Sequence, residues 1–120
     1  MNESQSNIVA LVQGGYFVLT GIWPIVSINT FQMVTGKKTD LWLVKTVALL
    51  VAVIGAVLLW AGATGNVTGQ TAALAMGSAL TLTIIDVYYV WRRVIAPIYL
   101  ADAAVELVLV AGWAAALMLR

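Results

Sequence analysis

Four long apolar stretches, separated by short polar segments, constrain this chain most. They cover residues 8–28, 41–63, 71–91 and 96–117. A helix needs roughly 20 mostly apolar residues to cross a hydrocarbon core of about 30 Å, and each stretch has that length. Only 9% of the 120 residues are charged, whereas about 25% is usual in a water-soluble domain. We therefore predict an all-α fold with a single domain, residues 1–120, that forms an antiparallel bundle of four transmembrane helices in a lipid bilayer.

Basic residues are unevenly distributed between the two ends of these stretches. Lys37 and Lys38 follow the first stretch, and Arg92 and Arg93 follow the third, whereas Arg120 and the N-terminal amine belong to the other side. Loops rich in Lys and Arg stay in the cytoplasm. We therefore predict a multi-pass protein of the cytoplasmic (inner) membrane, with loops 1 and 3 in the cytoplasm and both termini outside.

The composition excludes several kinds of chemistry. The chain has no histidine and no cysteine, which removes the commonest general base, the commonest metal ligand and the thiolate nucleophile. It has no basic tract of the kind that binds nucleic acid. We predict no metal site, no cofactor and no nucleic-acid partner, so any chemistry must come from carboxyl, amine or hydroxyl side chains.

Four ionisable residues lie within the apolar stretches, namely Lys45, Asp86, Asp102 and Glu106. Each charge costs about 2.5–3.5 kcal/mol at the centre of a membrane helix, so such residues face the bundle interior. At 1.5 Å per residue, the first three lie about 6–9 Å below the cytoplasmic interface, and Glu106 lies one turn deeper. We predict that these side chains meet, with Lys45 as the counter-ion of the acids.

Two tyrosines share helix faces with these acids. Tyr89 lies three residues after Asp86, and Tyr99 precedes Asp102 by three residues, which is the spacing of neighbours on a helix surface. The predicted ligand-binding or proton-linked site therefore consists of Asp86, Asp102, Glu106, Lys45, Tyr89 and Tyr99. Because one lysine cannot neutralise three acids, we expect Glu106, the deepest, to be protonated. We also expect Lys45→Met to destabilise the protein more than Lys38→Met.

Small residues cluster in the outer halves of the last two stretches. Ala73-xxx-Gly77 and Gly112-xxx-Ala116 are patterns that allow helix backbones to approach closely in a membrane. The cytoplasmic halves carry larger and more polar side chains. This difference predicts a vestibule that opens to the cytoplasm, and the small-residue faces predict a homodimer.

Residues 31–46, Phe-Gln-Met-Val-Thr-Gly-Lys-Lys-Thr-Asp-Leu-Trp-Leu-Val-Lys-Thr, resemble a segment of small, uncharacterised bacterial four-helix integral membrane proteins. The resemblance extends to Asp86-Val87-Tyr88-Tyr89 and implies membrane residence alone. Small multidrug-resistance transporters are similar in length and helix number, but they rely on a glutamate in the first helix, which residues 8–28 lack. Sterol-isomerase-like proteins are similar in placing paired acids in a membrane bundle over a lipid-like ligand, without a match of individual residues.

These observations leave several functions open. We favour binding or transport of a small cationic or lipid-like molecule with proton linkage. An intramembrane isomerase-like enzyme is an alternative, with Glu106 as the acid and Asp102 or Asp86 as the base. An accessory subunit whose charges pair with a larger membrane complex is another. A purely structural role, in which the buried charges fix the helix register, also stays open, so the sequence does not decide whether this chain is an enzyme.

Overall fold

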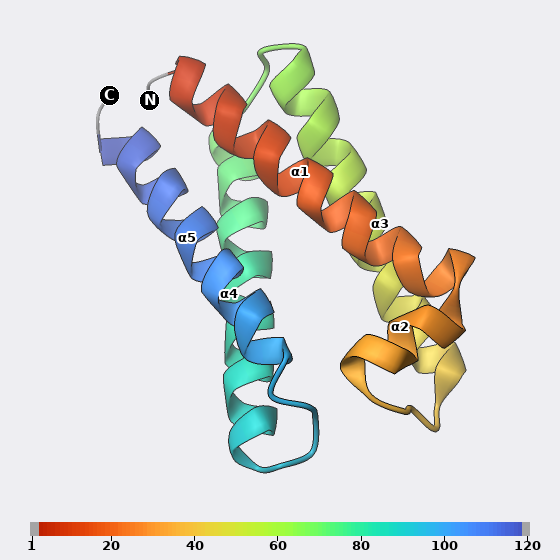
Figure 1. Cartoon of the computed structure of the whole chain (residues 1–120). Coiled ribbons are helices and arrows are strands. Elements are labelled where there is room, and N and C mark those ends of the chain that lie inside the picture. Colours follow the sequence, from red (N-terminus) through yellow and green to blue (C-terminus); the bar gives the residue numbers. More distant parts are fainter. Residues whose placement is uncertain (1–2, 119–120) are drawn as a thin grey trace.

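The computed structural model describes residues 3–118, in which five α-helices and no strand occur. The helices are α1 (Glu3–Val26), α2 (Ile28–Thr35), α3 (Leu41–Ala63), α4 (Gly69–Trp91) and α5 (Tyr99–Met118). All except α2 are long and apolar enough to cross a membrane, and these four run alternately in opposite directions (Figure 1). The predicted all-α, antiparallel bundle of four transmembrane helices is confirmed.

The short helix α2 lies in a segment that the sequence predicted as a loop. The first spanning helix ends at Val26, two residues after Pro24, rather than at residue 28. The Ser27 hydroxyl then accepts a hydrogen bond from the Thr30 amide and begins α2. A serine in this position satisfies one of the free amides at a helix start, which explains why a new helix follows the break.

The last helix also begins later than expected. The apolar stretch predicts a start at residue 96, but α5 begins at Tyr99. Pro97 lies in the preceding turn, where the Tyr99 amide donates to the Ala96 carbonyl at 3.1 Å.

Glycines bring α1 and α3 into direct backbone contact. Gly14 and Gly21 lie seven residues apart on α1, and Gly55 and Gly62 lie seven apart on α3. A Cβ atom on Gly21 would lie 2.5 Å from the Ala48 carbonyl oxygen, and one on Gly55 would lie 2.8 Å from the Gly14 oxygen. Close packing of this kind stabilises helix pairs in lipid, where the hydrophobic effect does not act between helices.

Alanines pack α4 against α5, and of the two small-residue pairs expected there Ala116 is buried, whereas Ala73 and Gly77 are exposed. Ala72, Ala75 and Ala79 are buried, whereas Ala73 is exposed and no atom lies within 4 Å of where a Gly77 Cβ would be. The spacing of the buried alanines places them on one helix face, which is turned away from the expected one. Ala73 and Gly77 therefore do not join the two helices, and the homodimer assigned to this exposed face stays a prediction.

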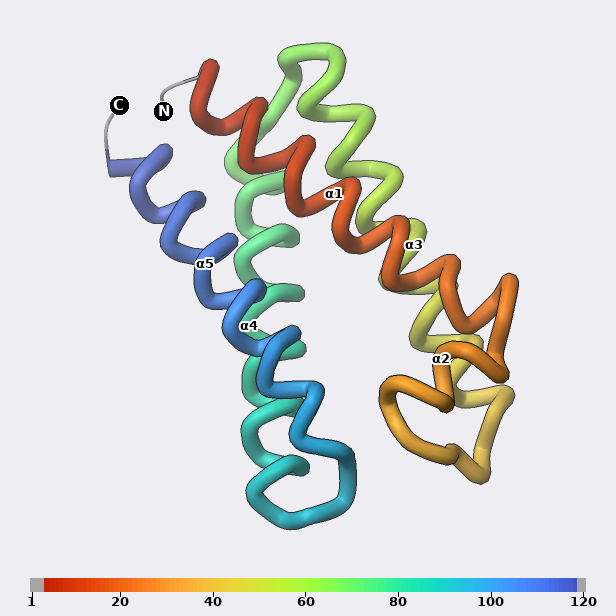
Figure 2. The backbone as a smooth tube through the Cα atoms, in the orientation of Figure 1, coloured from red at the N-terminus to blue at the C-terminus, as the bar shows by residue number. Residues whose placement is uncertain are grey.

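The four spanning helices form two pairs, α1 with α3 and α4 with α5. The two pairs meet at one end of the molecule and diverge toward the other (Figures 1 and 2). Both described ends of the chain and the α3–α4 connection lie at the joined end, while α2 and the α4–α5 connection lie at the other. Side chains of all four spanning helices form the core near the joined end, namely Ala10, Leu58, Ala72, Ala75 and Trp113. Contacts between α3 and α4 are few, so each pair is a unit of its own over much of its length.

A buried glutamine ties the two pairs together. The Trp113 indole N–H donates to Gln13 Oε1 at 2.7 Å, and Gln13 Nε2 donates to the Ala75 carbonyl at 2.9 Å. These bonds connect α1 to α5 and to α4. Interhelical hydrogen bonds of this kind contribute about 0.6–1.7 kcal/mol each in membranes. Gln13 therefore stabilises the joined end of the bundle.

Candidate functional site

The structure brings the three intramembrane acids together between α4 and α5. Asp86 comes from α4, and Asp102 and Glu106 lie one turn apart on α5. Asp102 is close enough to interact electrostatically with both other carboxyl groups. Asp86 and Glu106 are only 4% and 1% exposed, whereas Asp102 is partly exposed. We call these three residues the acid cluster.

Tyr16 of α1 also belongs to this site, although the sequence analysis did not include it. Its hydroxyl donates a hydrogen bond of 2.5 Å to Asp102 Oδ1. The signal that would have identified it is the polar stripe of α1, in which Gln13, Tyr16 and Thr20 follow helical spacing. Tyr89 and Tyr99 were found from acids on the same helix face, whereas Glu3 is the only charged residue of α1 and lies far from Tyr16 in the sequence.

The structure does not place Lys45 at the acid cluster. Its side chain is exposed, and within residues 3–118 it forms no ion pair. The reason is the pairing of the helices, because α3 packs against α1 and has few contacts with α4. Equal depth in the membrane therefore does not bring Lys45 to the acids. The prediction that Lys45 is their counter-ion is wrong for this structure.

Neither of the two expected tyrosines bonds to an acid in the described structure. Tyr89 is 37% exposed and packs edge-on against Tyr88, with ring centroids 5.0 Å apart. Tyr99 instead lies beneath the ammonium group of Lys38, at 5.1 Å from Nζ to the ring centroid. Neither tyrosine therefore joins the acid cluster through a hydrogen bond in this structure.

Lys38, rather than Lys45, is the lysine with specific partners. Its Nζ donates to the carbonyl oxygens of Thr35 and Gly36, each at 3.0 Å, and lies over the Tyr99 ring. The segment that follows α2 thereby reaches across the diverging ends of the two helix pairs to the start of α5 (Figure 1). We call this set of interactions the Lys38 contact.

The acid cluster has unsatisfied oxygens. Both carboxyl oxygens of Glu106 and Oδ2 of Asp86 are buried without a hydrogen-bond partner among the described residues. In the same part of the chain, no group of His, Cys, Asp or Glu is arranged to hold a metal ion. Ionised carboxyl groups without a partner are very unfavourable in an apolar interior. Protonation is the simplest way for these residues to lose their charge.

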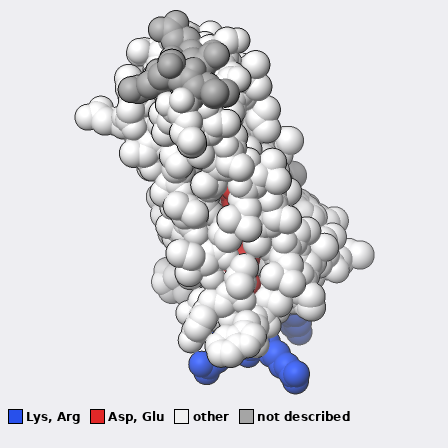
Figure 3. Space-filling model, turned by 90° about the vertical axis from the view of Figure 1, so that its left-hand side faces the viewer, with Lys and Arg blue, Asp and Glu red and all other residues white. Residues whose placement is uncertain are grey.

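Asp86 and Glu106 are almost completely enclosed in this conformation, while Asp102 is partly exposed. Small areas of acidic atoms are visible between uncharged side chains, while the visible Lys and Arg side chains gather at the lower end (Figure 3). Cavities of about 590 and 460 Å³ lie elsewhere, and no acidic residue lines either. With Glu106 only 1% exposed, the expected vestibule does not reach it.

The chain matches no protein-family model. No curated protein is significantly similar to it, and no solved structure is either.

Proposed function

We propose that this chain binds or transports a small cationic or lipid-like molecule in exchange for protons at the acid cluster. The observation that carries this proposal is Glu106, whose two carboxyl oxygens are buried, accept no hydrogen bond from an N–H or O–H donor of the described residues, and lie beside the Asp102 carboxyl. Burial of an ionisable side chain this deep in a membrane bundle is energetically unfavourable, and such residues usually serve a function. Glu106 is therefore a functional candidate by default.

Proton exchange follows from the charges around the cluster. Asp86, Asp102 and Glu106 would together carry three negative charges, and Tyr16 supplies only a neutral donor. While the site is closed, protons bound to the carboxyl groups reduce its negative charge. An arriving monovalent cation displaces one of these protons to the solvent, so the buried charge is unchanged by the exchange.

Access to the cluster requires the two helix pairs to separate. They are joined by the Gln13 hydrogen bonds at one end and by the Lys38 contact at the other. The proposal therefore includes a closed state, as described here, and an open state in which the Lys38 contact is broken and the pairs part.

We assign the diverging end to the cytoplasm and the protein to the cytoplasmic membrane. Support comes from Lys37, Lys38, Arg92 and Arg93, which lie in the connections at that end, in accord with the positive-inside rule. Arg120, which the same prediction placed outside, lies beyond the described residues. On this assignment the protons and the ligand enter the cluster from the cytoplasm.

The test uses Glu106→Gln, which removes the titratable proton but keeps the size of the side chain. Asp40→Asn is the matched control, because Asp40 is exposed at the start of α3. The probe is tetraphenylphosphonium, and proton release on binding is measured in weakly buffered detergent solution. We expect the wild type and the Asp40 variant to release protons, and the Glu106 variant to fold but release none. Unchanged proton release in Glu106→Gln would assign Glu106 a structural role.

A second candidate function is that of an accessory subunit. The acid cluster has no basic partner within residues 3–118, and acidic atoms show between side chains at the surface (Figure 3). A Lys or Arg on a helix of another protein could supply the missing charge there. In that case the isolated chain would bind no tetraphenylphosphonium at any pH, and Glu106→Gln would weaken assembly with the partner.

A further inference from the structure

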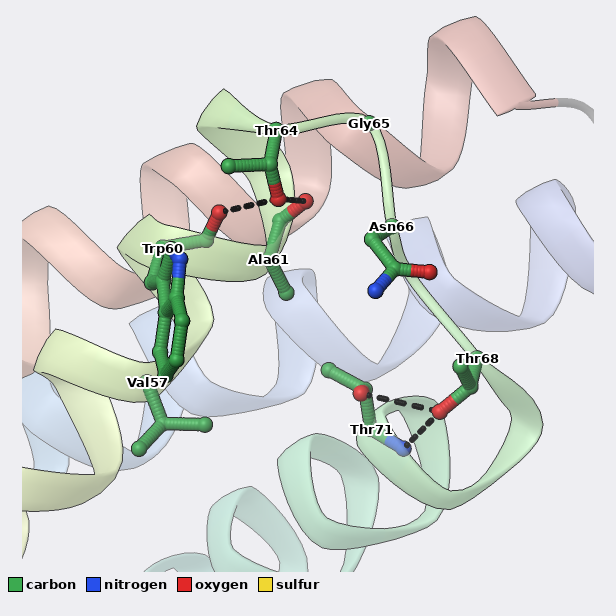
Figure 4. A pocket seen from close by; sticks show the side chains of 8 residues that line it. All are labelled: Val57, Trp60, Ala61, Thr64, Gly65, Asn66, Thr68 and Thr71. Carbon is green, nitrogen blue, oxygen red and sulfur yellow. Dashed lines mark hydrogen bonds between the residues drawn. The ribbon is translucent and has the colours of Figure 1, made fainter.

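A cavity separate from the acid cluster opens at the connection between α3 and α4, at the joined end of the bundle (Figure 4). Its volume is about 590 Å³, within the range of roughly 300–1,000 Å³ that is usual for small-molecule sites. It is lined by Val57, Trp60, Ala61, Thr64, Gly65, Asn66, Thr68 and Thr71.

The two walls of this cavity differ in character. Val57 and Trp60 of α3 form an apolar and aromatic wall, and Trp60 is 71% exposed. The amide of Asn66 and the side chain of Thr71 lie on the opposite wall (Figure 4). A molecule held between these walls would have one apolar face and one face rich in hydrogen-bonding groups.

Several donors and acceptors around the cavity are free to bind a ligand. Within the described part of the chain, the side-chain amide of Asn66 and the Trp60 indole N–H have no hydrogen-bond partner, and both residues are exposed. The hydroxyls of Thr68 and Thr71 bond to each other at 3.1 Å, and Thr68 Oγ1 also accepts the Thr71 amide at 3.2 Å, which leaves one hydroxyl proton and two lone pairs for a ligand. Thr64 is different, since its hydroxyl donates to the Trp60 carbonyl at 2.8 Å.

The cavity offers no charge to a ligand. All eight lining residues are uncharged, and the described lysines and arginines belong to α3 near its start and to the connections at the opposite end. A phosphate or carboxylate group would lose water there without gaining a positive partner. The chemistry of the cavity therefore favours a neutral ligand with several hydroxyl groups.

We infer that this cavity binds an uncharged polyol, with its carbon–hydrogen face on the Trp60 ring and its hydroxyls on Asn66, Thr68 and Thr71. Tryptophan suits such a role because its ring is broad and apolar, while its N–H can still donate. The polyol could be the head of a neutral glycolipid, since Val57 leads from the cavity toward the apolar part of α3, or a free sugar. This inference is independent of the function proposed for the acid cluster.

The test measures both sources of the polyol. The protein is placed in phosphatidylcholine nanodiscs that contain monoglucosyldiacylglycerol, and retained glycolipid is counted by native mass spectrometry. Binding of free methyl glucoside is measured by saturation-transfer NMR. The variants are Asn66→Ala and Trp60→Leu. Trp42→Leu is the matched control, because Trp42 is 68% exposed at the other end of the same helix.

We expect the wild type and Trp42→Leu to bind the glycolipid, and Asn66→Ala and Trp60→Leu to bind it about tenfold more weakly. All variants should keep the thermal stability of the wild type, because the changed side chains are exposed. Binding of methyl glucoside with the same dependence on Asn66 would support the inference with a free sugar as the ligand. Binding of neither probe, or binding that Asn66→Ala and Trp60→Leu leave unchanged, would overturn it, as would retention of phosphatidylcholine in preference to the glycolipid.

Discussion

The hydroxyl of Tyr16 donates to Oδ1 of Asp102 at 2.5 Å, and this hydrogen bond joins α1 to α5 beside the acid cluster. It gives Asp102 a donor that Asp86 Oδ2 and the two Glu106 oxygens lack among the described residues. The three acids are therefore not equivalent. Asp102 accepts the Tyr16 bond and is partly exposed. Glu106 is enclosed, receives no N–H or O–H donor among the described residues, and lies beside the Asp102 carboxyl, which makes Glu106 the residue better suited to exchange a proton.

Tyr16→Phe tests the contribution of this bond. Removal of the hydroxyl leaves Asp102 Oδ1 without its donor, and we expect the free energy of unfolding in detergent to fall by about 1–2 kcal/mol. Tyr88→Phe is the control, because the Tyr88 hydroxyl accepts only a long bond of 3.4 Å from exposed Arg92. Equal stability of the two variants would show that the Tyr16 hydroxyl contributes nothing to the fold.

The glycine contacts between α1 and α3 give a second prediction. Gly21→Ala would place a Cβ 2.5 Å from the Ala48 carbonyl oxygen, so the two helices must move apart. We expect a loss of about 1–3 kcal/mol, as for other overpacked interiors. Gly77→Ala is the control, since no atom lies within 4 Å of its added Cβ, and it should be neutral or stabilising by up to about 1 kcal/mol. Thermal unfolding of the purified variants in one detergent compares them directly, and the reverse order would contradict the packing of α1 on α3.

Much of this architecture could be predicted because it depends on length and depth. The four apolar stretches gave the spanning helices, and α3 has the predicted bounds, 41–63. Counting residues from the interface placed Asp86 and Asp102 at one level, and the structure brings them together. Depth in a membrane is a local property, since each helix is held by its own hydrophobic length.

The lateral pairing of the helices could not be obtained in the same way. Lys45 has the expected depth, but α3 packs on α1 rather than beside the acids, because Gly14, Gly21 and Gly55 allow close backbone contact there. Small residues on α4 were equally ambiguous, as the buried Ala72 and the exposed Ala73 are adjacent. Side chains of nearly the same size do not reveal which face meets a neighbour.

The helices α3 and α4 end with the same backbone motif but with different residues in it. This difference gives a third prediction. Gly65 has φ 66° at the end of α3, and Arg93 has φ 59° at the end of α4. In each case two amides bond back into the last turn, for example Val94 to Tyr89 at 2.8 Å. A residue other than glycine in this left-handed region costs about 1–2 kcal/mol.

We therefore expect Arg93→Gly to raise the free energy of unfolding by about 1 kcal/mol and Gly65→Ala to lower it by a similar amount. Arg92→Gly is the control for the lost charge, because Arg92 has φ −78° and gains nothing from glycine. All three are compared by thermal unfolding in the same detergent. A loss of stability in Arg93→Gly as large as in Arg92→Gly would show that charge, and not backbone conformation, dominates at this position.

The last prediction concerns the two lysines at the diverging end and reverses the order expected from the sequence. Lys38 Nζ donates to the Thr35 and Gly36 carbonyls and lies over the Tyr99 ring, whereas Lys45 is exposed. Lys38→Met keeps most of the side-chain length but removes the donors and the charge. We expect it to lower the free energy of unfolding by about 1–2 kcal/mol, while Lys45→Met should change it by less than about 0.5 kcal/mol.

Hydrogen exchange distinguishes loss of the Lys38 contact from general destabilisation. Because the contact connects the segment after α2 to the start of α5, Lys38→Met should speed amide exchange in residues 28–40 and leave α3 protected. The same variant should bind tetraphenylphosphonium faster, since the proposed open state would form more readily once the contact is gone. A larger loss of stability in Lys45→Met than in Lys38→Met would instead favour Lys45 as the counter-ion of the acids, and would contradict the arrangement of helices on which the closed state depends.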